Sequence, residues 1–173
     1  PLTALRTELA QRFDRDWGGF SPAPKFPHAP MIARLLRDWR ATARQPEPDL
    51  QALFMATFTL KRMIEGGLFD QLGGGFARYS VDERWEIPHF EKMLYDNGQL
   101  LSVLAEATQA TGDGDFARTM TATADCLLRD FRLPGGSFAA AFDADSEGRE
   151  GVFYMWIPEQ VRAVLDEGDA ALF

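Results

Sequence analysis

The stretch at residues 66–97, GGLFDQLGGGFARYSVDERWEIPHFEKMLYDN, decides the fold of this chain. Its glycine pair ends a helical pattern at residues 48–67. The apolar residues of that pattern share one broad face, which holds Leu53, Phe54, Phe58 and Met63. A second helical pattern follows Pro88, and proline suits the first turn of a helix. The stretch therefore predicts a helix, a long loop, and a new helix that begins near Pro88.

The same unit occurs three times along the chain. The first copy runs from Gly18 through a proline-rich loop to a helix near Pro30, and the third runs from Gly135 to a helix near Pro158. In the first copy the apolar residues at helical spacing are Ile32, Leu35, Leu36 and Trp39. From Pro30 to Pro88 the repeat is about 60 residues long. A repeat of this length has room for two helices and the loops that join them, which is one helical hairpin.

Short connections join the helices at their other ends, at residues 43–49 and 111–115, so the long loops gather on one side. Aromatic and β-branched residues at 76–87 and 151–157 predict short β-hairpins inside those loops. We therefore expect an all-α chain, an incomplete (α/α) toroid of about three helical hairpins with long loops and short β-hairpins at one end. Residues 1–173 should form one domain, a fragment of a longer ring or a self-associating unit.

The composition excludes several classes of function. A formal net charge of −8 disfavours nucleic acid, because a phosphate backbone would be repelled. The sequence shows neither a membrane span nor a signal peptide, and a cytoplasmic location is expected. Cys126 is the single cysteine and lies inside a helical pattern, which indicates a buried and inert thiol.

The densest group of polar and aromatic residues lies at residues 69–97. With Pro88 in a first helical turn, His89 and Asp96 would share one helical face, and Glu91 would lie away from it with Tyr95 one turn on. An imidazole titrates near neutrality, which makes His89 a candidate general acid or base. The alternative is that His89 only caps the helix.

A second group is FDADSEGREGVFY at residues 142–154. Its crowded carboxylates, Asp143, Asp145, Glu147 and Glu150, could hold a metal or serve as an acid and base pair. The calcium-loop pattern fails, because its twelfth position is Tyr154 rather than glutamate. A turn in which the carboxylates cap backbone amides is the alternative.

The first long loop offers Lys25, Phe26 and His28 between prolines. They could contact a ligand or form a structural collar around the mouth of the ring. Several aromatic side chains could stack on a sugar or simply fill the space between hairpins: Trp17, Phe20, Phe76, Tyr79 and Trp85. Arg78 could bind a carboxylate or a pair of hydroxyls, or pair with a nearby acid.

Three motifs together resemble a known family: GGF-x-PAPKFPHAP from residue 18, residues 66–101, and FDADSEGREGVFYMW from residue 142. They are similar to the central part of the thioredoxin-domain-containing, spermatogenesis-associated type proteins. That resemblance implies an N-terminal thioredoxin-like domain, which these residues do not contain, followed by a toroid similar to N-acylglucosamine 2-epimerase and six-hairpin glycosidase barrels. It further implies a cavity at the mouth of the ring that is shared by His89, Glu91, Asp96, Asp143, Asp145 and Glu147.

Our first hypothesis is a carbohydrate-active domain of the sugar epimerase or isomerase type, without metal or cofactor. Its proton-transfer residues would be His89, Glu91, Asp96, Asp143 and Asp145. The residues expected to contact the sugar are Lys25, Phe26, Arg78, Tyr79, Trp85, Tyr95 and Glu147. Two alternatives are a glycosidase-like hydrolase with paired carboxylates, and a non-catalytic binding or scaffold module for the attached thioredoxin-like redox domain.

Overall fold

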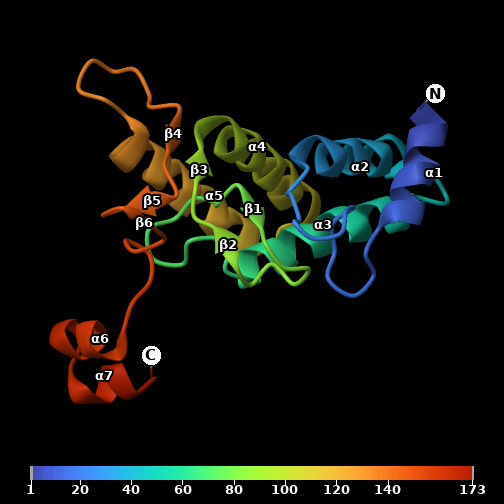
Figure 1. Cartoon of the computed structure of the whole chain (residues 1–173). Helices are drawn as coiled ribbons and strands as arrows, with labels where there is room; N and C mark the ends of the chain where they lie inside the picture. The colour runs from blue at the N-terminus through green and yellow to red at the C-terminus, as the bar shows by residue number, and fades with distance from the viewer. Residues whose placement is uncertain (1, 173) are drawn as a thin grey trace.

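Helices α2 and α4 pack against each other, and each also packs against the helix that follows it (Figure 1). The computed structural model describes residues 2–172. Its helices are α1 Leu2–Arg12, α2 Ala29–Thr42, α3 Leu50–Glu65, α4 Leu94–Thr111, α5 Gly114–Cys126 with a π-helical turn Leu127–Phe131, α6 Pro158–Val164 and α7 Glu167–Leu172. Its strands are β1 Tyr79–Ser80, β2 Pro88–His89, β3 Lys92–Met93, β4 Ala141–Phe142, β5 Asp145–Ser146 and β6 Arg149–Glu150. No helix in this range is long and apolar enough to cross a membrane.

The apolar face predicted for α2 is confirmed, because Ile32, Leu35 and Leu36 are buried. The face predicted for α3 is wrong in part. Phe54 is 53% exposed and stacks on Phe58 near the surface, with ring centroids 5.3 Å apart. Smaller and more flexible residues form the buried face of α3: Ala52, Met55, Ala56, Thr59, Leu60 and Met63. The alanines let neighbouring helices approach closely, which a phenylalanine at those positions would prevent.

The three long loops, at residues 13–28, 66–93 and 132–157, lie side by side and form what we call the loop layer. Lys25 and Ser80 exchange backbone hydrogen bonds of 2.7 and 2.9 Å, which join the first loop to the second. Strand β3 pairs with β4 and thereby joins the second loop to the third. The expected gathering of long loops at the starts of α2 and α4 is therefore confirmed.

The predicted helix start at Pro88 is wrong. Pro88 and His89 form β2, which pairs with β1, and α4 begins only at Leu94. The proline has no amide hydrogen, yet the residues beside it pair with β1 in the same loop, and β3 pairs with β4 in the third loop. This pairing outweighs the local helical preference. The β1–β2 hairpin was predicted correctly. The third loop differs, because its hairpin is β5–β6 at residues 145–150 rather than 151–157.

The repeat in the sequence is also a repeat of hydrogen bonds. Residues 14–20, DRDWGGF, and residues 70–76, DQLGGGF, fold into the same turn. The shared bonds run from Gly18 N to Asp14 O at 2.9 Å and from Asp14 N to Gly19 O at 3.0 Å, and from Gly74 N to Asp70 O and Asp70 N to Gly75 O at 2.9 Å each. All four glycines have positive φ, which only glycine adopts without strain.

A buried lysine holds each of these turns. Lys25 is fully buried, and its Nζ donates to Asp14 Oδ2 at 2.6 Å and to the carbonyl of Glu83 at 3.0 Å, 5.2 Å from the ring centroid of Trp85. Lys92 repeats the arrangement with the Asp70 carboxylate, the Gly74 carbonyl and the Tyr154 ring. Burial opposes ionisation of both aspartates, but hydrogen bonds from the lysines and from turn amides lower their pKa overall.

We call this arrangement, in which a buried lysine binds a turn aspartate and a backbone carbonyl, the lysine clamp, and a substitution tests it. Lys25→Met should lower the free energy of unfolding by about 3 kcal/mol, because it leaves Asp14 and a carbonyl without their buried partner. The matched control is Lys61→Met, since Lys61 also pairs with an aspartate, at 2.7 Å, but is 40% exposed. The control should cost less than about 1 kcal/mol. Urea denaturation measures both, and equal losses would contradict the clamp.

Candidate functional site

Residues 88–93 run nearly extended, so their side chains face alternate sides of the loop layer. His89 and Glu91 face one side, where their side chains approach each other to 3.9 Å. Phe90 and Lys92 face the other side, where Phe90 stacks on Tyr154 and Lys92 bonds to Asp70. The segment therefore separates two distinct groups of functional side chains.

The first group we call the His89 cluster. It contains Arg78, Tyr79, His89, Glu91, Tyr95, Asp96 and Glu150. These residues come from the β1–β2 hairpin and the residues that flank it, from the first turn of α4, and from β6 in the third loop. Two of the three long loops and the start of an inner helix thus contribute to one site.

The imidazole of His89 is held on two sides. Its Nδ1 lies 2.7 Å from Glu150 Oε1, and its ring is nearly parallel to that of Tyr79, with centroids 4.7 Å apart and an angle of 12°. Phe26 packs on Tyr79 in turn, at 4.9 Å. The side chain keeps 25% of its surface exposed. His89 is therefore fixed in orientation, with Nε2 as the nitrogen that Glu150 does not bind.

Arg78 and Glu91 form the charged part of the cluster. The guanidinium Nη1 lies 2.8 Å from Glu91 Oε2, and the Arg78 amide donates to the Glu91 carbonyl at 2.8 Å. The hydrogen bond from Arg78 to Glu91 raises the pKa of the guanidinium, which stays protonated. A fixed cation of this kind can stabilise negative charge on a ligand oxygen.

Asp96 has the most perturbed carboxyl group of the cluster. Burial raises its pKa to about 6, while the positive charge of Arg78 and a hydrogen bond with Tyr95 act in the opposite direction. Its Oδ2 atom is buried and has no hydrogen-bond partner within residues 2–172. A carboxyl group that changes protonation near neutral pH can both accept and return a proton.

The family resemblance implied a cavity shared by His89 and the carboxylates of Asp143, Asp145 and Glu147, but Asp143 and Asp145 line a cavity whose lining does not include His89. Across residues 2–172, no hydrogen bond or ion pair joins those three carboxylates to the His89 cluster. Glu150 makes that contact instead. Strand pairing of β5 with β6 brings it there, and the sequence gives no sign of which acidic residue the register will select.

Lys25 and Trp85 were expected to contact a substrate, and their positions contradict this. Both are fully buried, and the Trp85 Nε1 donates to the carbonyl of Trp17 at 2.8 Å. For both residues the sequence had left a purely structural role as the alternative, and their burial agrees with that role. Phe26 remains at the surface, and Tyr95 is 50% exposed beside Asp96.

The second histidine does not join the first. His28 is the residue before α2, and its ring contacts Phe26, which packs on Tyr79, whereas His89 contacts Tyr79 directly. No group of three histidine, cysteine, aspartate or glutamate side chains in the described part of the chain could hold a metal ion.

Comparison with known sequences identifies relatives. Spermatogenesis-associated protein 20 of Rattus norvegicus is 39% identical over 166 residues, which cover 92% of this chain and 21% of the rat protein. The Homo sapiens protein is 37% identical over the same length and coverage. This chain therefore spans about a fifth of the length of these relatives. No protein-family model matches it.

Comparison with solved structures identifies the fold. The cellobiose 2-epimerase of Bacillus thermoamylovorans superposes with a TM-score of 0.63 at 14% identity, over 82% of this chain and 40% of the epimerase. A D-mannose isomerase superposes with a TM-score of 0.55 at 12% identity, over 80% and 34% of the two chains. The expected incomplete helical toroid is confirmed.

The raised pKa of Asp96 predicts a pH-dependent stability. Because the folded pKa, about 6, exceeds the unfolded one, 3.8, this group's contribution is complete below pH 4 and is lost as the pH rises through 6. Asp96→Asn, which stays neutral, should therefore be more stable than the wild type at pH 8 by about 1–2 kcal/mol, after a discount for partial exposure, and not at pH 4. Thermal unfolding at both pH values measures this, with Asp125→Asn on the exposed face of α5 as control. The same pH profile for both aspartate variants would contradict it.

The contact with Glu150 predicts one tautomer of His89. A carboxylate only accepts hydrogen bonds, so with Nδ1 2.7 Å from Glu150 Oε1 we expect neutral His89 to carry its hydrogen on Nδ1. In alkaline solution, ¹⁵N NMR of the imidazole should show this form, and Glu150→Gln should convert it to a mixture of tautomers. Glu147→Gln, on the same hairpin, should leave the spectrum unchanged. An Nε2–H tautomer in the wild type would disprove the contact.

Proposed function

Because this chain is homologous to a section of spermatogenesis-associated protein 20 and shares the helical fold of sugar epimerases, we propose that the His89 cluster binds a sugar and moves a proton beside its carbonyl group. The substrate class is an aldose or a close derivative. The reaction is epimerisation or isomerisation of the epimerase type. The observation that supports it most directly is the buried Asp96 oxygen without a partner, next to Arg78 and Glu91.

The chemistry requires three groups. A base must take the proton from the carbon next to the carbonyl, an acid must return a proton, and a positive group must stabilise the intermediate oxygen anion. The His89 Nε2 atom and the Asp96 carboxyl are the candidates for base and acid. Arg78 is the cation.

The proposed steps conserve protons and charge. The base breaks the C2–H bond of the open-chain sugar, and the electron pair moves onto the carbonyl oxygen to give an enediolate. Return of a proton to the opposite face of C2 gives the epimer. Protonation at C1 gives the isomeric ketose when the C2 hydroxyl also loses its proton and becomes the new carbonyl, and the C1 oxygen gains a proton. Arg78 faces the developing negative charge throughout, and its pairing with Glu91 keeps it in place.

The exposed ring of Tyr95 is the proposed stacking surface for the sugar. Tyr79 is less suited to this, since His89 lies on one of its faces and Phe26 packs against it as well. Tyr95 is 50% exposed and adjoins both Arg78 and Asp96. An aromatic ring with one free face and a hydroxyl can hold the apolar side of a sugar while polar groups bind its hydroxyls.

The experiment is hydrogen exchange at C2. The protein is incubated in D₂O with glucose, mannose and cellobiose, and ¹H NMR follows replacement of the C2 hydrogen by deuterium. Exchange reports proton abstraction even when no net epimerisation accumulates. His89→Phe keeps the stack on Tyr79 but cannot transfer a proton, so it should slow exchange about 100-fold or more.

Controls separate this proposal from its alternatives. Glu147→Gln should exchange at the wild-type rate. Release of glucose from cellobiose would favour a glycosidase-like hydrolase. Sugar binding without exchange, or neither, would overturn the proton-transfer proposal and favour a binding or scaffold module for a thioredoxin-like domain.

A further inference from the structure

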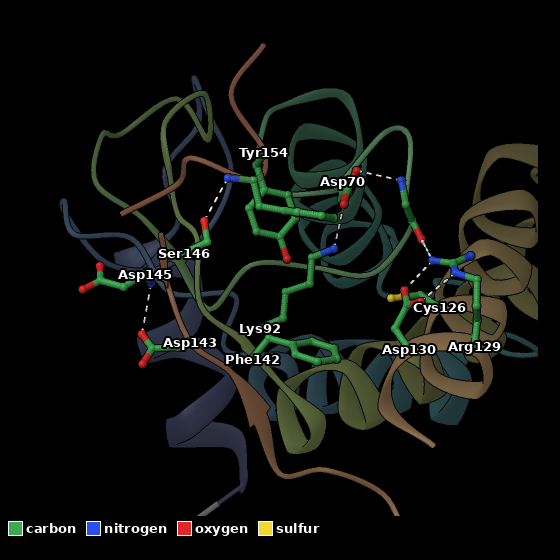
Figure 2. A pocket seen from close by; sticks show the side chains of 12 residues that line it. Asp70, Lys92, Cys126, Arg129, Asp130, Phe142, Asp143, Asp145, Ser146 and Tyr154 are labelled. Atoms are coloured by element: carbon green, nitrogen blue, oxygen red, sulfur yellow. Dashed lines mark hydrogen bonds and ion pairs between the residues drawn. The ribbon is translucent and has the colours of Figure 1, made fainter. Parts of the chain in front are cut away.

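A separate cavity lies on the other side of residues 88–93, where Lys92 rather than His89 faces it. Its volume is about 710 Å³, enough for a drug-sized molecule. Figure 2 shows its lining, which comes from the second loop, from β3, from the end of α5 and from the third loop. The proposed sugar site uses none of these side chains.

The positive groups of this cavity are already neutralised. Lys92 Nζ lies 2.7 Å from Asp70 Oδ2 and donates to the Gly74 carbonyl at 2.8 Å. Arg129 binds Asp130 through Nε at 2.8 Å and donates to the Gly73 carbonyl at 2.7 Å. The lining holds these two cations and four carboxylates, Asp70, Asp130, Asp143 and Asp145, so its excess negative charge does not favour anions.

Two carboxylates of the lining, those of Asp143 and Asp145, can still bind a cationic group. Within residues 2–172, neither Asp143 nor Asp145 has a cationic partner, and the one hydrogen bond between them runs from the Asp145 amide to Asp143 Oδ1 at 3.0 Å. Figure 2 shows both at one end of the cavity, away from the pairs of Lys92 and Arg129. This end therefore carries two uncompensated negative charges.

The middle of the cavity is aromatic. Phe142 packs edge-on against Phe131 at 4.4 Å, and Tyr154 is fixed between Phe90 and the ammonium group of Lys92. In Figure 2 the Tyr154 hydroxyl points into the cavity between the two ends. Phe153, which lies edge-on to Tyr154 at 5.1 Å, is 76% exposed and offers a free ring face at the rim.

We propose that this cavity binds an organic cation, an ammonium, guanidinium or amidinium group carried on a flat apolar body. The hollow and its aromatic wall accept the apolar body, and Asp143 and Asp145 bind the cationic group. A neutral apolar ligand would leave the two carboxylates partly desolvated and unpaired. The net charge of −8 also attracts cations to the whole surface.

Three probes of the same shape test the charge preference: benzamidine, benzamide and benzoate, which are cationic, neutral and anionic. Calorimetric titration measures binding, and NMR shifts of the Tyr154 and Phe142 rings locate it. Benzamidine should bind at least tenfold more tightly than either other probe and should shift both rings.

Variants test the residues. Asp143→Asn with Asp145→Asn should weaken benzamidine binding about tenfold or more, and because both side chains are exposed the fold should persist. Glu147→Gln, which removes one negative charge from the same loop outside the lining, should change binding less than twofold. Asp96→Asn, in α4 and outside the lining, should also leave binding unchanged, which separates this site from the proposed sugar site. Absence of benzamidine binding, equal binding of benzoate, or no effect of the double variant would each overturn the proposal.

Discussion

The backbone pairing of residues 88–93 with two other parts of the loop layer is the constraint on which the functional surface depends. β2 is bound to β1, and β3 is bound to β4 of the third loop. Because β2 and β3 each have a strand partner, residues 88–93 stay extended. The side chains of an extended backbone point alternately to opposite sides. His89 and Glu91 therefore face one site while Phe90 and Lys92 face another. A helix beginning at Pro88 would instead have put His89 and Asp96 on one face and turned Glu91 away from it.

Buried lysines hold the loops in the positions that this pairing requires. Lys25 and Lys92 each bind the aspartate of a D-x-x-x-G turn and a backbone carbonyl, beside an aromatic ring. The third copy at residues 133–138, LPGGSF, has no such aspartate, and Phe138 is 40% exposed where Phe20 and Phe76 are buried. Figure 1 shows α6 and α7 to one side of the four central helices. Helices α2 and α4 each follow a loop that a buried lysine holds, and these two helices pack against each other.

The proposed proton-transfer site and the proposed cation site share one physical origin. In both sites, backbone pairing within the loop layer positions the polar side chains, and most of them already have an ion-pair or hydrogen-bond partner. A few polar groups in each site have none. In the His89 cluster the unsatisfied atom is an oxygen of Asp96, and in the cavity it is the carboxylates of Asp143 and Asp145 that lack a cation. Unsatisfied polar groups beside satisfied ones are where a ligand gains most from binding. The two sites use different side chains, because they lie on opposite sides of residues 88–93.

The sequence alone determined the helical hairpins, the long loops between Gly-Gly and the next helix, the buried face of α2 and the β1–β2 hairpin. These features follow from local rules, because helical periodicity and turn chemistry act over a few neighbouring residues. Only the tertiary structure decided that Pro88 lies in a strand, that Lys25 and Trp85 are buried, and that Glu150 rather than Asp143, Asp145 or Glu147 contacts His89. Strand register and burial depend on partners tens of residues away, and a change of register by one residue reverses the side that every side chain faces.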